Sequence, residues 1–175
     1  MATWTIEDPI VVNGVKTAKI LGYIQELDPF DLSECSVDRG PDLANPERLE
    51  LWIMDQSAAA FIARLDIFAL RILMSNAQRF FDEPLSPMQV LERYKPALET
   101  LGGELPLLIA RLSLDAPCHE IKRGPDGRPP SWEGLVVNPM FDIKSLWFTE
   151  DAWGPTVEVL ELDYDIRHYL SLIPL

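Results

Sequence analysis

The sequence is poor in the residues that most metal sites and disulfide frameworks use. It has two cysteines, Cys35 and Cys118, and two histidines, His119 and His168, among 175 residues. Two isolated cysteines do not make the disulfide pattern of a small secreted domain, so we expect free thiols in a reducing compartment. A zinc site needs several Cys or His ligands close together. We therefore predict that the protein has no metal and no cofactor.

Signature motifs and membrane segments are also missing. The sequence contains no GxGxxG, GxxxxGK[ST], HExxH or GxSxG pattern, so a phosphate-binding loop, a zinc protease and a serine hydrolase are not indicated. The N-terminus lacks the basic and apolar regions of a secretory signal. The longest apolar run, residues 58–74, is interrupted by Arg64, Asp66 and Arg71, whereas a spanning helix needs about 20 mostly apolar residues. We expect a cytoplasmic protein that does not cross a membrane.

Positive charge is scarce relative to negative charge. Lys and Arg number 15 and Asp and Glu number 28, which gives a formal net charge of −13, while 47% of the residues are hydrophobic. Disorder would pair high charge with low hydrophobicity, so this chain folds. An acidic chain repels a phosphodiester backbone unless a basic groove compensates. We therefore expect a basic protein as partner and no direct nucleic-acid binding; the oligomeric state is left open.

The N-terminal third predicts strands and a long loop. Strands are expected over residues 3–6, 10–12 and 15–25, with Asn13-Gly14 as the turn of a hairpin. Residues 28–48 are polar and contain three prolines, which is typical of a surface loop. A short strand over 49–54 follows.

Helices are predicted for the middle of the chain. The periodicity over residues 57–81 favours one long helix with an arginine stripe on its polar side. Ser86 and Gln89 form a capping-box pattern at the start of a second helix, which Pro96 should kink and Gly102-Gly103 should end.

The rest of the chain again predicts strands. They are expected at 107–114, 118–122, 132–137, 143–148 and 156–162, and residues 164–172 suit a strand or a short helix. We predict an α+β fold in one domain, residues 1–175. Its mixed or antiparallel sheet combines the N-terminal hairpin with the C-terminal strands and packs on two central helices within about residues 57–101.

Three places could carry chemistry, and none supplies a complete set of roles. Asp115, Glu120 and Lys122 could hold a divalent metal as in some nucleases, but such short patterns are common by chance. Cys118 and His119 could form a nucleophile–base pair, although neighbours on a strand point to opposite faces. Asp66 lies on the apolar side of the predicted helix, where a structural ion pair with an arginine is the favoured explanation. We predict a protein that is not an enzyme.

The C-terminal third carries the densest acidity beside aromatic residues. Acids on a strand can simply guard an exposed edge, but aromatic anchors within an acidic rim are also typical of an interface with a basic protein. The predicted partner-binding residues are Glu150, Asp151, Trp153, Glu158, Glu161, Asp163 and Asp165.

We predict a non-enzymatic acidic binding module that captures a basic partner, in the class of intracellular immunity proteins that neutralise a toxin. One alternative is a DNA mimic that occupies a nucleic-acid-binding site with carboxylates spaced like phosphates. The other is a small hydrolase using Cys118 and His119, or Asp115, Glu120 and Lys122.

Overall fold

The computed structural model describes residues 4–22, 30–31, 34–100, 105–113, 115–120 and 131–164. Its helices are α1 (Gln56–Ser75), α2 (Ala77–Phe80) and α3 (Pro87–Arg93). Its strands are β1 (Thr5–Ile6), β2 (Ile10–Val12), β3 (Val15–Leu21), β4 (Phe30–Asp31), β5 (Cys35–Arg39), β6 (Arg48–Trp52), β7 (Leu98–Glu99), β8 (Leu107–Leu112), β9 (Cys118–Glu120), β10 (Val136–Phe148) and β11 (Trp153–Tyr164). This mixture agrees with the predicted α+β class, but the eleven-stranded sheet is larger than predicted. None of the described helices is long and apolar enough to cross a membrane.

The chain forms two compact units, each assembled from three separate stretches. Unit 1 consists of Met1–Asp28, Phe61–Ala97 and Ile143–Thr156, and unit 2 consists of Pro29–Ala60, Leu98–Asp142 and Val157–Leu175. Charge is divided unequally between them. Unit 1 has eight Lys and Arg against ten Asp and Glu, whereas unit 2 has seven against eighteen. Unit 2 therefore carries −11 of the net charge of −13.

Unit 1 begins with the predicted hairpin. β2 and β3 pair antiparallel, with Val12 opposite Val15, and the two turn residues both have positive φ, 51° at Asn13 and 81° at Gly14. This is the turn geometry that Asn-Gly favours. β3 then pairs antiparallel with β1 and with the C-terminal part of β10. The Asn-Gly hairpin prediction is confirmed.

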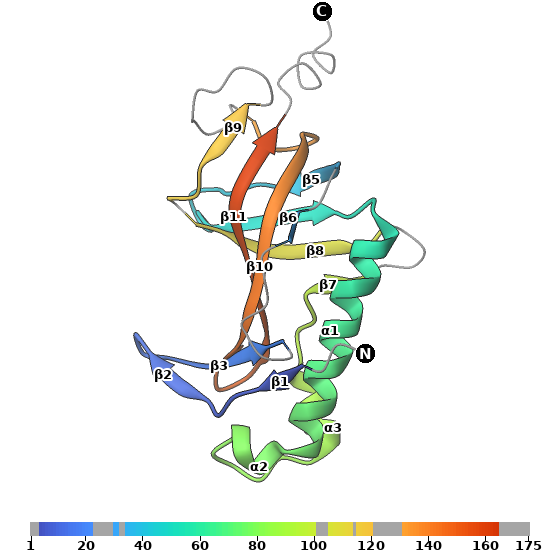
Figure 1. The fold of residues 1–175 in the computed structure, drawn as a ribbon. Coiled ribbons are helices and arrows are strands. Elements are labelled where there is room, and N and C mark those ends of the chain that lie inside the picture. The colour runs from blue at the N-terminus through green and yellow to red at the C-terminus, as the bar shows by residue number, and fades with distance from the viewer. Residues whose placement is uncertain are drawn as a thin grey trace, which may run out of the picture. The chain divides into compact units, whose positions relative to one another are not determined.

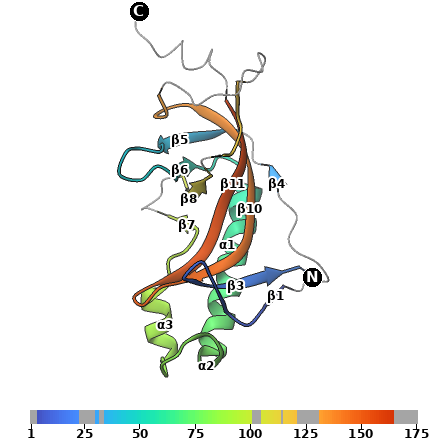
Figure 2. The ribbon, with the colours of Figure 1, turned by 90° about the vertical axis from the view of Figure 1, so that its left-hand side faces the viewer.

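The helices are shorter than predicted. In place of one helix over 57–81, α1 ends at Ser75 and the short α2 follows; the Asn76 side chain donates a hydrogen bond to the Ile72 carbonyl at this break. The second predicted helix stops at Arg93, because Tyr94 is extended at φ −71° and ψ 130°. Its capping box is present: Ser86 Oγ accepts from the Gln89 N–H at 3.3 Å, and Gln89 Oε1 accepts from the Ser86 N–H at 2.9 Å. Both ribbon views show α2 and α3 beyond the C-terminal end of α1 (Figures 1 and 2).

Unit 2 corrects the prediction of a loop over residues 28–48. That stretch contains β4 and β5, and its last residue begins β6. β5, β6 and β8 lie side by side as antiparallel neighbours, and β8 pairs in parallel with β11, which also pairs with β9 (Figure 1). One further difference is β10, which joins the strands predicted at 132–137 and 143–148 into a single strand of 13 residues. The predicted element at 164–172 lies almost wholly outside the described residues.

Candidate functional site

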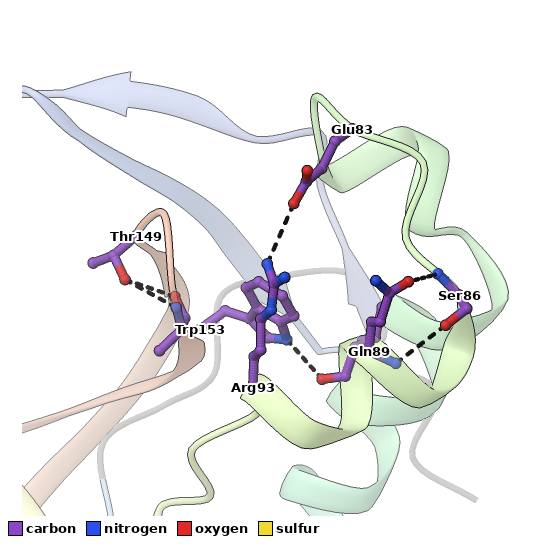
Figure 3. A network of polar contacts seen from close by, with 8 residues as sticks. Glu83, Ser86, Gln89, Arg93, Thr149 and Trp153 are labelled. Atoms are coloured by element: carbon purple, nitrogen blue, oxygen red, sulfur yellow. Dashed lines mark hydrogen bonds and ion pairs between the residues drawn. The ribbon is translucent and has the colours of Figure 1, made fainter.

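The predicted partner-binding residues at the β10–β11 turn have contrasting positions in unit 1. Glu150 and Asp151 are exposed. Trp153 is only 1% exposed, and its indole N–H donates to the Val90 carbonyl at 3.1 Å (Figure 3). Its ring lies 4.4 Å from that of Phe81, centroid to centroid. The structure therefore places Trp153 in the core of unit 1, and the two acids on the surface.

The other predicted acids lie along β11 in unit 2 and are half-buried. Glu158 is directly opposite Arg111 on β8. Glu161 lies 3.1 Å from His119, between Oε1 and Nε2, and Asp163 is directly opposite the same histidine. These acids are thus next to basic or titratable neighbours of their own sheet. Asp165 is outside the described residues.

The candidate catalytic groups are not assembled into a site in the described part of the chain. Cys118 and His119 are successive residues of β9, so their side chains leave opposite faces of the sheet. Cys118 is buried, whereas His119 is directed to Glu161. Asp115 is exposed; the side chain of Glu120 and all of Lys122 lie outside the description. Among the described residues, no three His, Cys, Asp or Glu side chains are grouped so that they could hold a metal ion.

Asp66 has the buried position that the sequence predicts, with hydrogen-bond partners that it did not predict. The residue is 8% exposed, and Oδ1 accepts a hydrogen bond from the Tyr94 hydroxyl at 2.8 Å. Both carboxylate oxygens also lie 3.0 Å from the Ala97 amide nitrogen. Burial, and then the nearby Asp66 carboxylate, raises the pKa of Tyr94 far above its ordinary value. Asp66 joins α1 to the segment after α3, which is a structural role.

Sequence reasoning missed one cluster in unit 2, which we call the arginine face: Arg39 on β5, Arg48 on β6 and Arg111 on β8. Arg48 is directly opposite Arg111. A register shift in β5 between Val37 and Arg39 brings Arg39 opposite Glu50, which is two residues from Arg48 on the same side of β6. Residues opposite one another in antiparallel strands share a face of the sheet. All three arginines are exposed. Only strand register brings them together, because they are spread over 73 positions of the sequence.

Trp52 lies on the same face. It is two residues from Glu50 along β6, is half-buried, and donates its indole N–H to Asp38 at 3.0 Å. Ile109 of β8, opposite Glu50, adds a half-buried apolar side chain. The face therefore combines guanidinium groups with aromatic and aliphatic surface.

Two of the three arginines are paired with carboxylates. Two like charges directly opposite one another destabilise a sheet. Arg48 and Arg111 stand in this relation, and each of the two has a carboxylate partner. Arg48 Nε lies 2.5 Å from Glu50 Oε1, and Arg111 makes two hydrogen bonds to Glu47, at 2.5 and 3.2 Å. The hydrogen bond to Glu47, together with the charge of Glu158, raises the pKa of Arg111. Each of these two guanidinium groups thus has a carboxylate partner on the face.

Comparison with solved structures finds a likeness in fold. No protein-family model matches the sequence, and no curated protein is significantly similar to it. Among solved structures, a C-terminally truncated single-stranded DNA-binding protein from bacteriophage Enc34 is similar at a TM-score of 0.52 with 9% sequence identity. The likeness covers 92% of this chain and 95% of that one. At this level of identity it shows that the two chains share a fold.

Proposed function

We propose that this protein binds single-stranded nucleic acid on the arginine face of unit 2. One observation carries the proposal: the described part of this strongly acidic unit has three arginines and no lysine, and all three lie on one face beside Trp52. A guanidinium group binds a phosphate through two parallel hydrogen bonds. An aromatic ring offers a surface on which any base can stack.

The carboxylates on the face set the expected strength of binding. Glu47 and Glu50 accept hydrogen bonds from Arg111 and Arg48, and a bound phosphate would compete with them for these guanidinium groups. At most three phosphates can be bound in this way. The logarithm of the affinity should then fall by about 2 for each tenfold rise in salt, since each phosphate contact on a single strand contributes about 0.7. We expect weak, salt-sensitive and sequence-tolerant binding.

The shared fold supports the proposal as an analogy. The Enc34 protein is by its title a single-stranded DNA-binding protein, and its fold is matched over nearly the whole length of both chains. Function resides in particular sites and not in a fold. The residues of the arginine face are therefore the part to be tested.

The direct experiment is fluorescence anisotropy with a labelled 20-nucleotide oligothymidine in 20 mM and 200 mM salt. Arg39→Gln is the most informative variant. In the described part of the chain Arg39 has no ion pair like those of Arg48 with Glu50 and of Arg111 with Glu47, so the substitution breaks no such pair. Loss of one phosphate contact should weaken binding about fivefold at low salt. The matched control is Arg71→Gln, which removes an equal charge from the exposed side of α1.

Trp52→Leu should also weaken binding, with a smaller change in salt dependence than Arg39→Gln, because stacking is not electrostatic. Failure of the wild-type protein to bind oligothymidine in 20 mM salt would overturn the proposal. An equal loss from Arg39→Gln and Arg71→Gln would also overturn it, since binding would then depend only on total charge.

We propose capture of a basic protein as a second candidate function, of the kind an intracellular toxin-neutralising immunity protein performs. The charge of −11 on unit 2 favours it, because an acidic surface accelerates encounter with a basic partner. The test is titration with a lysine-rich peptide of 20 residues. If the β11 acids contact the peptide, Asp163→Asn should weaken its binding. Arg39→Gln should strengthen its binding. A peptide affinity that these changes leave untouched would reject this candidate.

A further inference from the structure

Unit 1 contains a groove of about 580 Å³ that shares no residue with the arginine face. It lies between the tip of the β2–β3 hairpin, the segment after α2 and the β10–β11 turn. Its lining consists of Val11, Gly14, Lys16, Phe80, Phe81, Asp82, Glu83, Leu85, Phe148, Thr149, Glu150 and Trp153. A groove of this size holds a few side chains of a ligand.

The floor of the groove is aromatic and tightly packed. Phe80 and Phe148 are almost fully buried, and their rings stack at 6.2 Å between centroids with an interplanar angle of 7°. Phe81 lies against both Phe148 and Trp153. The guanidinium of Arg93 lies 5.7 Å from the centre of the Trp153 ring, while its Nη1 is 3.2 Å from Glu83 (Figure 3). Phe80, Phe148 and Trp153 thus form the packed base of the groove, and Phe81, which is half-buried, is the ring of this cluster that a ligand can reach.

One wall of the groove is an exposed apolar side chain. Val11 is 69% exposed and is directly opposite Lys16, so both project from the groove side of the hairpin. Leu85 is half-buried on the side contributed by the segment after α2. An apolar side chain of a partner could therefore contact Val11, Leu85 and Phe81 together.

The rim of the groove is acidic. Asp82 is 97% exposed and its carboxylate lies 3.0 Å from Lys16 Nζ. Glu83 is paired with Arg93, and Glu150 and its neighbour Asp151 are exposed at the β10–β11 turn. Among the lining residues, three carboxylates thus stand against one basic group, Lys16. A ligand that fits this rim carries positive charge.

We propose that this groove binds an extended peptide segment of a protein partner, in which an apolar side chain lies beside lysine or arginine. The apolar side chain packs between Val11 and Leu85 on the aromatic floor, and the basic side chain contacts Glu150 and Asp151. The charge of the rim selects a basic segment, and the floor selects an apolar one. This inference is independent both of nucleic-acid binding and of the β11 acids in unit 2, because the groove lies wholly in unit 1.

Three labelled peptides of eight residues test the proposal by anisotropy in 50 mM salt. One alternates Lys with Phe, one alternates Glu with Phe, and one alternates Lys with Ser. We expect only the Lys/Phe peptide to bind. If the Lys/Ser peptide binds equally well, the groove is not the binding site, and the protein binds basic chains by charge alone. If the Glu/Phe peptide binds equally well, the acidic rim does not select the ligand.

Matched variants locate the peptide. Val11→Ser and Glu150→Gln should each lower the affinity for the Lys/Phe peptide by about threefold or more, because Val11→Ser removes an apolar contact and Glu150→Gln removes a charged one. Their controls are Ile67→Ser, which is 51% exposed on α1, and Glu92→Gln on the exposed side of α3; neither lines the groove. Arg39→Gln should leave the affinity for this peptide within twofold. The inference fails if the control variants weaken the peptide as much as the groove variants do.

Discussion

Asp66 is the buried polar residue whose partners are best defined. It accepts hydrogen bonds from the Tyr94 hydroxyl and from the Ala97 amide. Asp66→Ala leaves both donors without this acceptor, so we expect a loss of about 2–4 kcal/mol in the free energy of unfolding. Tyr94→Phe removes one donor and should cost about 1–2 kcal/mol. Urea denaturation measures both, with exposed Glu92→Gln as the control that should stay within about 0.5 kcal/mol of wild type. Equal stabilities of all three variants would contradict this role.

Cys35 is expected to make stability depend on alkaline pH. Burial, and then the charge of Asp55, raises the pKa of this thiol from 9.0 to about 12. The folded state therefore retains the proton that the unfolded state releases. Stability is full below pH 9 and is lost as the pH rises towards 12, by about 1.4 kcal/mol per pH unit.

The comparison protein for this effect is Cys35→Ala, studied by urea denaturation with a reducing agent at pH 8, 9, 10 and 11. Its stability should fall less steeply than that of the wild type above pH 9, whatever the cost of the substitution itself. Parallel curves for the two proteins would show that the thiol keeps an ordinary pKa.

At the scale of elements, Gly154 fixes the approach of β11 to the segment after α3. A Cβ atom at this position would lie 2.2 Å from the Lys95 carbonyl oxygen, and the Lys95 amide donates to the Trp153 carbonyl at 2.8 Å. Gly154→Ala must push these two backbones apart, and we expect it to cost about 1–3 kcal/mol in urea denaturation. Gly14→Ala is the contrasting variant, because it meets no atom within 4 Å and tests only the positive φ. A Gly154→Ala variant as stable as wild type would exclude the close approach.

Elements whose determinants are local could be predicted, and those that depend on distant partners could not. Asn13-Gly14 and the Ser86 capping box are local signals, and both features are present. We did not predict β5, because its last two residues are exposed and prolines lie near both of its ends, so the sequence lacks the pattern of a strand. Its extended conformation depends on pairing with β6 and β10. The extended segment after Arg93 depends on a hydrogen bond to Asp66, 31 residues before Ala97.

At the candidate sites, too, the features that the sequence did not show depend on contacts between residues far apart in the chain. The arginine face depends on the register of three strands, and no sequence spacing between Arg39, Arg48 and Arg111 indicates it. For Trp153 the sequence shows an aromatic residue among acids, which fits an interface anchor equally well. Its burial follows from packing against Phe81 and from the hydrogen bond to Val90, both distant in sequence.

At the scale of the whole molecule, the uneven charge makes the two candidate functions respond in opposite ways to the same substitutions. Asp31, Asp115 and Glu133 are exposed acids of unit 2 outside the arginine face. Charges roughly 20 Å apart in water interact by about 0.2 kcal/mol, and the effect adds over several charges. Replacing all three by their amides should therefore raise the affinity for oligothymidine several-fold in 20 mM salt and lower the affinity for a lysine-rich peptide by a similar factor.

Salt identifies the cause of these opposite shifts. At 0.5 M salt the screening length is about 4 Å, so both changes should shrink to within measurement error. A loss that persists for the peptide would mean that one of the three acids contacts it directly. If the triple variant leaves oligothymidine binding unchanged in 20 mM salt, the −11 charge of unit 2 does not oppose binding at the arginine face, and the weak affinity expected there must come from Glu47 and Glu50 alone.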